Sequence, residues 1–310
     1  MTQALGYLSA VAIGLLLAQV LPMAGALAVQ GVVAPALFLL MVLTFAALPA
    51  DAHPRPGFSR FLGALAVANF LGVPVLLAVL LVVGQGIVDL PTAVLLPALL
   101  VLLAPCIDYV VPFSKLAGAA YHQLLRATPL LLLGQVVAVP LWLSVFGLLV
   151  GAEWELQLSP VGLWPILHAA LVFLVLPLCV VWAVRRLNPQ WLVAAQKAMD
   201  PAMWLVLGSI AAGYGGAITQ SDDLPPLAVF YVGFALAAYL LGGAVGAWSG
   251  LALVRRRAVA MSAMTRNSLV VLPIAMSVAP GPMTPAVVVC QTVCELLVIC
   301  MLQMVRKSTV

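Results

Sequence analysis

The stretch ALAVANFLGVPVLLAVLLVV at residues 64–83 decides the fold class. It has no charged side chain and is as long as the roughly 20 residues that a helix needs to cross about 30 Å of hydrocarbon. A second uncharged run covers residues 226–253. An outer-membrane barrel would instead show short strands of alternating polarity. These runs therefore predict transmembrane helices.

The composition extends this prediction to the whole chain of 310 residues. Hydrophobic residues make up 65% of the chain and charged residues 7%, whereas a soluble domain carries about 25% charged residues. So few charges could not solvate a soluble surface, but they suit a surface that faces lipid. The start of the chain lacks the basic region of a cleavable signal peptide, so the first apolar run is expected to be a span. The five cysteines lie in apolar runs and are expected to be reduced thiols rather than a disulfide framework: Cys106, Cys179, Cys290, Cys294 and Cys300.

The apolar runs predict an all-α, polytopic protein with ten transmembrane helices. The predicted spans are 4–21, 31–49, 59–84, 90–113, 119–149, 160–184, 201–218, 225–253, 258–279 and 284–304. With this count, every basic loop residue falls on one side of the membrane, and the opposite loops carry only acidic charges. The positive-inside rule then places both termini and the even-numbered loops in the cytoplasm, in an inner or plasma membrane.

Two proline pairs indicate an internal repeat. Residues 105–112 read PCIDYVVP, and residues 273–280, five spans later, read PIAMSVAP. Because five is odd, the second copy would cross the membrane in the opposite direction. We therefore expect a single membrane domain built from two inverted repeats, 1–150 and 151–310, of the kind found in many secondary transporters. The alternative is a coincidence among apolar helices.

The same prolines predict helix breaks. Pro105 and Pro112 lie in span 4, and Pro273 lies in span 9. A proline removes one backbone hydrogen bond and displaces a carbonyl. Freed backbone groups are tolerated at membrane depth only beside protein or a cavity. We expect spans 4 and 9 to be broken helices that cross each other, the alternative being two simple kinks.

Among the ionisable residues inside predicted spans, three are candidates for function. They are Asp108 in span 4, Arg266 in span 9 and Glu295 in span 10. Each would cost at least about 2.5–3.5 kcal/mol if it faced lipid, so each is expected to face the interior. Arg266 is followed by Asn267 and Ser268 in the densest polar cluster of any span. It needs an acidic partner, either Asp108 or Glu295, and this pair could be purely structural.

Further candidates follow from spacing. Gln291 precedes Glu295 by four residues, so the two share a helix face. Cys290 and Cys294 have the same spacing, and buried cysteines usually pack as small hydrophobic residues. Cys106 follows Pro105 directly, where backbone groups are released, and its sulfur could ligate a soft metalloid.

Three motifs resemble the arsenite-efflux branch of the bile/arsenite/riboflavin transporter superfamily. They are APC at 104–106, TRNSLVVLP at 265–273 and QTVCEL at 291–296. The resemblance implies a core of spans 3–5 and 8–10, a flatter panel of spans 1, 2, 6 and 7, and crossing of spans 4 and 9. It also implies that Cys106 contacts the metalloid and that Glu295 is the membrane-embedded glutamate of span 10.

The chain departs from this family in span 9. Exporters of the arsenite branch usually carry an Asn-Asn-Phe-Glu type of stretch, where this chain has RNSL at 266–269. The bile-acid branch binds sodium through a Ser-Asn pair in span 4 and a Glu and a Gln in span 9. Here span 4 has Cys106 and Asp108, and span 9 has Arg266. A fixed cation at that position argues against sodium coupling and could replace the ion electrostatically.

These features predict a secondary transporter that exports arsenite or antimonite, coupled to protons or to the membrane potential. The alternative is an organic-anion carrier, sodium-coupled or sodium-independent, in which Arg266 holds the anion. The expected partners are a small inorganic oxyacid or organic anion, protons and lipid, with no cofactor and no nucleic acid. An intramembrane enzyme would need a catalytic pair at one depth, and a sensor would not need matched broken helices. The chain has no zinc-protease, nucleophile-elbow or P-loop motif, and His122 and His168 are expected to be packing residues.

Overall fold

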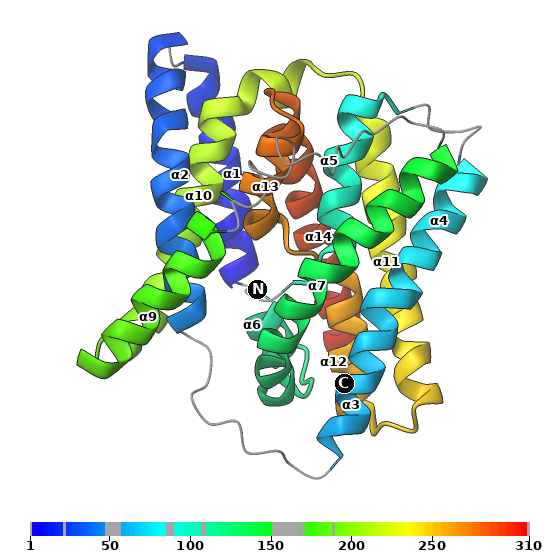
Figure 1. Cartoon of the computed structure of the whole chain (residues 1–310). Helices are drawn as coiled ribbons and strands as arrows, with labels where there is room; N and C mark the ends of the chain where they lie inside the picture. The colour runs from blue at the N-terminus through cyan, green and yellow to red at the C-terminus, as the bar shows by residue number, and fades with distance from the viewer. Residues whose placement is uncertain are drawn as a thin grey trace. The chain divides into compact units, whose positions relative to one another are not determined.

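The computed structural model describes residues 2–20, 23–46, 57–84, 90–106, 110–150, 168, 171–187 and 190–308. All the elements in these ranges are helices, and the only strand-like pairing in them is one isolated bridge. Figure 1 shows the helices in chain order, coloured from blue to red. The predicted all-α class is therefore confirmed for the described residues.

Five described helices are long and apolar enough to cross a membrane. They cover Val29–Ala46, Phe58–Val83, Tyr121–Leu149, Leu224–Trp248 and Met283–Met304. Shorter apolar helices cover Leu5–Val20, Ala93–Leu103 and Ser268–Val278. These are the helices expected of a membrane-embedded protein. Most of the first half of the predicted span 160–184 lies outside the described residues.

The chain divides into two compact units, each built from segments of both halves of the sequence. The first unit comprises Met1–Ala47, Glu155–Leu224 and Leu269–Val293, and the second comprises Leu48–Trp154, Pro225–Ser268 and Cys294–Val310. This division follows the expected panel and core along most of the chain. It differs at Leu269–Val293, which belongs to the first unit.

In the first unit, α1 (Thr2–Val20) and α2 (Met23–Ala46) pack against α10 (Trp191–Gln220), as Figure 1 shows. Small residues allow this close approach, because a Cβ atom on Gly14 would lie 2.5 Å from the carbonyl oxygen of Gly208. The remaining elements of this unit are η2 (Leu171–Val175), α9 (Leu176–Leu187), α13 (Ser268–Val278, from its second residue onward) and the first part of α14 (Met283–Ser308).

The second unit contains the site. Its elements are α3 (Phe58–Val67), η1 (Ala68–Gly72), α4 (Val73–Gly84), α5 (Thr92–Leu103), α6 (Val110–Leu116), α7 (Tyr121–Val150), α11 (Leu224–Trp248), α12 (Leu253–Met264) and the second part of α14. The helix α12 contacts α3, η1, α6 and α7. Almost all of α12 beyond its basic first turn is buried, so its last turn ends inside this unit.

Span 4 is broken as its sequence predicts. The helix α5 ends at Leu103 and α6 begins at Val110. Pro112 lies in the first turn of α6, where a proline is tolerated because the N–H it lacks would have no helical partner. Pro105, but not Pro112, therefore lies in the break itself.

The predicted break of span 9 at Pro273 is wrong. Pro273 lies inside the continuous helix α13, and the break is at residues 265–267, about two turns earlier. A membrane helix can continue through a proline when its surroundings satisfy the freed carbonyl. The interruption at 265–267 depends instead on backbone pairing with span 4, which a proline count does not register.

Candidate functional site

The two helix breaks of the second unit pair with each other. The N–H of Cys106 donates to the carbonyl of Thr265 at 3.2 Å, and the N–H of Asn267 donates to the carbonyl of Ala104 at 2.9 Å. These bonds make an antiparallel bridge that sets Pro105 opposite Arg266. Backbone groups that the ended helices α5 and α12 release are thereby satisfied by each other. We call residues 104–106 and 265–267 the crossing.

Local sequence favours the extended backbone of the crossing. Ala104 precedes a proline, which disfavours the helical region, and its ψ angle is 116°. Thr265 is β-branched and has a ψ angle of 136°. The Thr265 hydroxyl donates to the carbonyl of Met261 at 2.8 Å, which satisfies one of the last carbonyls of α12.

The bridge explains how a proline and a carboxylate fit at the crossing. In an antiparallel bridge of this kind, the two residues that face each other, here Pro105 and Arg266, do not donate their own N–H groups to the bridge. Pro105 has no N–H, so it leaves no donor without a partner. The N–H of Arg266 donates to Oε2 of Glu295 at 2.8 Å. Glu295, which is 1% exposed on α14, therefore accepts a backbone hydrogen bond at the break of span 9.

The guanidinium of Arg266 caps both helices that end at the crossing. Its Nη1 donates to the carbonyl of Leu102 at 3.2 Å, and its Nη2 donates to the carbonyl of Ser262 at 2.9 Å and to that of Ala263. Arg266 is 0% exposed. A positive charge is favourable at helix C-termini, where carbonyls carry the negative end of the dipole. Of the two predicted acidic partners of Arg266, Glu295 accepts its backbone N–H, whereas Asp108 lies outside the described residues.

The fourth acceptor of this guanidinium is Asn69, which the sequence analysis missed. Its Oδ1 accepts from Nη2 of Arg266 at 3.1 Å. Its Nδ2 donates to the carbonyl of Leu65 and to the hydroxyl of Ser262, both at 3.0 Å. Asn69 is the only residue with a polar side chain in the run at 64–83, and this isolation was the available signal.

Asn69 lies in η1, a short π-helical turn whose cause is visible in the sequence. Pro74 has no N–H to donate to the carbonyl of Phe70, four residues earlier. The indole Nε1 of Trp142 on α7 donates to that carbonyl at 2.8 Å instead. Such π turns within α-helices are frequent at functional sites.

Side chains at the crossing divide between two faces. Alternation along extended backbone places Cys106, Thr265 and Asn267 on one face, and Pro105 and Arg266 on the other. Cys106 is 1% exposed and Asn267 is fully buried. Neither Nδ2 nor Oδ1 of Asn267 has a hydrogen-bond partner among the described residues. Such a buried amide calls for a hydrogen-bond partner beyond those that the described residues supply.

No protein-family model matches this chain, and no curated protein matches it. The chemistry of the crossing is therefore what points to a function. One face presents a thiol and an amide, and the other is occupied by a guanidinium bound to oxygen atoms. The nearby carboxylate of Glu295 could carry a proton.

Two further predicted site residues, Ser268 and Gln291, are not among the residues of the crossing. Ser268 is buried, and its hydroxyl donates weakly to the Arg266 carbonyl at 3.4 Å. Gln291 is buried on α14 one turn before Glu295, in the segment that belongs to the first unit. His122 and His168 are exposed. In the described part of the chain, no group of three or more His, Cys, Asp or Glu side chains could hold a metal ion.

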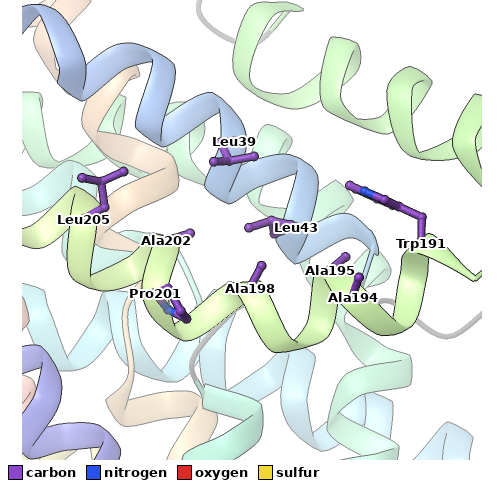
Figure 2. A pocket seen from close by; sticks show the side chains of 9 residues that line it. All are labelled: Leu39, Leu43, Trp191, Ala194, Ala195, Ala198, Pro201, Ala202 and Leu205. Carbon is purple, nitrogen blue, oxygen red and sulfur yellow. The ribbon is translucent and has the colours of Figure 1, made fainter.

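A cavity of about 410 Å³ lies in the first unit between α2 and α10. Figure 2 shows the nine side chains that line it: Leu39, Leu43, Trp191, Ala194, Ala195, Ala198, Pro201, Ala202 and Leu205. Apart from the indole N–H of Trp191, these side chains offer no hydrogen-bonding group. The crossing, rather than this cavity, has the chemistry to recognise a polar substrate.

Proposed function

We propose that this chain is a secondary transporter of the cell membrane that exports arsenite or antimonite. The observation that carries the proposal is the crossing of two broken helices with the buried thiol of Cys106 on one of its faces. Transporters commonly build substrate sites from discontinuous helices, because the released backbone groups and helix ends can meet a ligand. The polytopic architecture and the absence of an evident catalytic pair among the described residues support transport over catalysis.

The thiol of Cys106 favours a metalloid over other small solutes. Trivalent arsenic and antimony are soft centres that bond sulfur, and an apolar site alone would bind them poorly. In solution these metalloids carry hydroxyl groups, which need hydrogen-bond partners after they leave water. The amide of Asn267, on the same face of the crossing as Cys106, could supply both a donor and an acceptor.

Glu295 is the proposed proton carrier. Its carboxylate is buried and accepts the Arg266 N–H at the break of span 9. Protonation would weaken this bond, because a carboxylate is a stronger acceptor than a neutral acid. A proton that enters from outside could thus loosen the break while substrate leaves. Asp108 remains a candidate for the same role.

The proposed arrangement in the membrane has ten spans, two inverted repeats and both termini in the cytoplasm. It is supported by the sidedness of the charges, since the loops predicted to face outward contain acidic residues and no basic residue. The basic residues of the other loops would then face the cytoplasm.

An arsenite-sensitive host that lacks its own exporters provides the test. Cells that express the wild-type chain should expel preloaded arsenite, and Cys106→Ser should abolish this efflux while the protein remains in the membrane. Cys179→Ser and Cys300→Ser are the matched controls and should export at the wild-type rate. Wild-type efflux by Cys106→Ser would show that the thiol mechanism is wrong.

An organic-anion carrier is the second candidate. The buried Asn267 amide favours it as well, since an amide N–H can donate to a carboxylate or a sulfonate. The contacts of Arg266 favour it less, because its terminal nitrogens already donate to four protein oxygens. Thermal stabilisation of the purified chain by organic anions, with no response to arsenite, would decide for this candidate.

A further inference from the structure

The atoms around the Arg266 guanidinium form a set of oxygen ligands. Three are carbonyl oxygens of Leu102, Ser262 and Ala263, and the fourth is Oδ1 of Asn69. We call these four atoms the oxygen cage. None of them carries a formal charge, and all are held by helices of the second unit.

The oxygen cage has the chemistry of a monovalent-cation site. Hard cations select carbonyl and amide oxygens. The three carbonyls belong to the last turns of α5 and α12, where two helix dipoles present their negative ends to one point. In membrane transporters, the C-terminal ends of interrupted helices serve to hold coupling cations.

Arg266 brings its own positive charge into this cage through a covalent tether. The side chain leaves the crossing at the bridge position opposite Pro105 and caps both helix ends. Its guanidinium cannot dissociate from the protein, and it keeps its proton at any physiological pH. The cage is therefore filled with a charge that neither sodium concentration nor pH can remove.

We propose that Arg266 is a tethered cation that fills a monovalent-cation site, so that the chain needs no sodium and truncation of the side chain opens the site to free guanidinium or Na⁺. Sodium-independent transport rests on the proposed function. Occupation of the cage does not, because it can be measured as ligand binding in the purified chain.

Thermal unfolding of the full chain in detergent tests the cage directly. The baseline buffer contains N-methylglucamine chloride, whose cation is much larger than Na⁺ or guanidinium. NaCl or guanidinium chloride is then added at low millimolar concentrations. For Arg266→Ala, the unfolding midpoint should fall, and either added cation should raise it by a few degrees through preferential binding to the folded state. The wild-type midpoint should not respond. Arg255→Ala is the control, since this side chain lies in the first turn of α12 and donates to the carbonyl of Gly57, and the variant's midpoint should not depend on cations.

The result that would overturn the proposal is an Arg266→Ala protein whose midpoint ignores both cations. Stabilisation of the wild type by Na⁺ would overturn it equally, because the cage would then not be filled. If Arg266→Ala does not yield folded protein, Arg266→Lys keeps the charge and should fold without a sodium response, whereas Arg266→Met should fold only when guanidinium or Na⁺ is present during purification. Equal behaviour of the Lys and Met variants would contradict the role of charge. If the wild-type chain does not export arsenite but added cations still stabilise Arg266→Ala, the proposed substrate is wrong and the oxygen cage is unaffected.

Discussion

At the scale of single residues, Asn69 and Asn267 have the same side chain in opposite situations. Both are fully buried in the second unit. The amide of Asn69 has three protein partners, whereas that of Asn267 has none among the described residues. A group that makes its bonds within the protein stabilises the fold, whereas we propose that the Asn267 amide bonds the transported substrate. Stability and transport should therefore separate between them.

We expect Asn69→Ala to lower the free energy of unfolding by about 1–3 kcal/mol or more, because it leaves a guanidinium donor without its acceptor. Asn267→Ala removes no side-chain hydrogen bond to the described residues and should change stability by less than about 1 kcal/mol. It should nevertheless reduce arsenite efflux strongly. Thermal unfolding and efflux, measured on both variants, check these expectations. Equal loss of stability in the two would mean that Asn267 is merely a packing residue.

Glu295 can be tested with almost no change of shape. In Glu295→Gln, the amide oxygen can still accept the Arg266 N–H, so the crossing should remain intact. The new side chain cannot take up a proton, and the response of transport to an imposed pH gradient should disappear. Arsenite uptake into everted vesicles measures this response. Asp222→Asn, an exposed acidic position outside the long apolar helices, is the control and should respond like the wild type.

At the scale of elements, the helix from Phe58 to Gly84 shows how one proline changes the position of a distant contact. Pro74 leaves the carbonyl of Phe70 to the indole of Trp142, and the intervening π turn carries Asn69 to Arg266. Gly134 on the same helix as Trp142 leaves room for the Phe70 ring, since a Cβ there would lie 2.6 Å from it. The indole hydrogen bond of Trp142 and the space at Gly134 thus both hold the π turn against α7.

A double-mutant cycle tests this account of the π turn. Trp142→Phe should cost about 1–3 kcal/mol, because it leaves the half-buried carbonyl of Phe70 without its indole donor. Pro74→Ala supplies a new backbone N–H that can donate to this carbonyl. The Trp142→Phe substitution should therefore cost less in the Pro74→Ala background, and chemical or thermal unfolding of the four proteins measures the difference. Strict additivity would contradict a shared acceptor.

At the scale of the whole molecule, charge sidedness makes a prediction about orientation. In a protein whose native cysteines are replaced, Asp222→Cys should react with an impermeant maleimide added outside intact cells. Arg186→Cys should react only after the membrane is made permeable, since its loop is expected to be cytoplasmic. Labelling efficiency at the two sites is the measurement. The reverse pattern would contradict both the orientation and the inverted-repeat arrangement.

The fold could be predicted from the sequence where one signal dominates. Residues 64–83 predicted a helix long and apolar enough to cross a membrane, and the structure contains one there. Pro105 lies in a break because its missing N–H suits the bridge. The break of span 9 was misplaced at Pro273, since the real interruption depends on pairing between distant segments. The role of Asn69 was not predicted either, because a π turn determines where its side chain points. Contacts that depend on tertiary pairing leave little trace in local sequence.

The opposition of Pro105 and Arg266 has a consequence for how such sequences can diverge. One member of the pair has no N–H, and the N–H of the other is accepted by Glu295. Any residue except proline at 105 would bring a second N–H that points away from the bridge into a buried site, and no acceptor for it is assigned among the described residues. Among descendants of this chain, loss of proline at 105 should therefore be accompanied by a newly acquired acceptor nearby. Position 295 should likewise retain an oxygen as long as position 266 keeps its N–H. Substitutions at these sites are thus expected to occur together rather than singly.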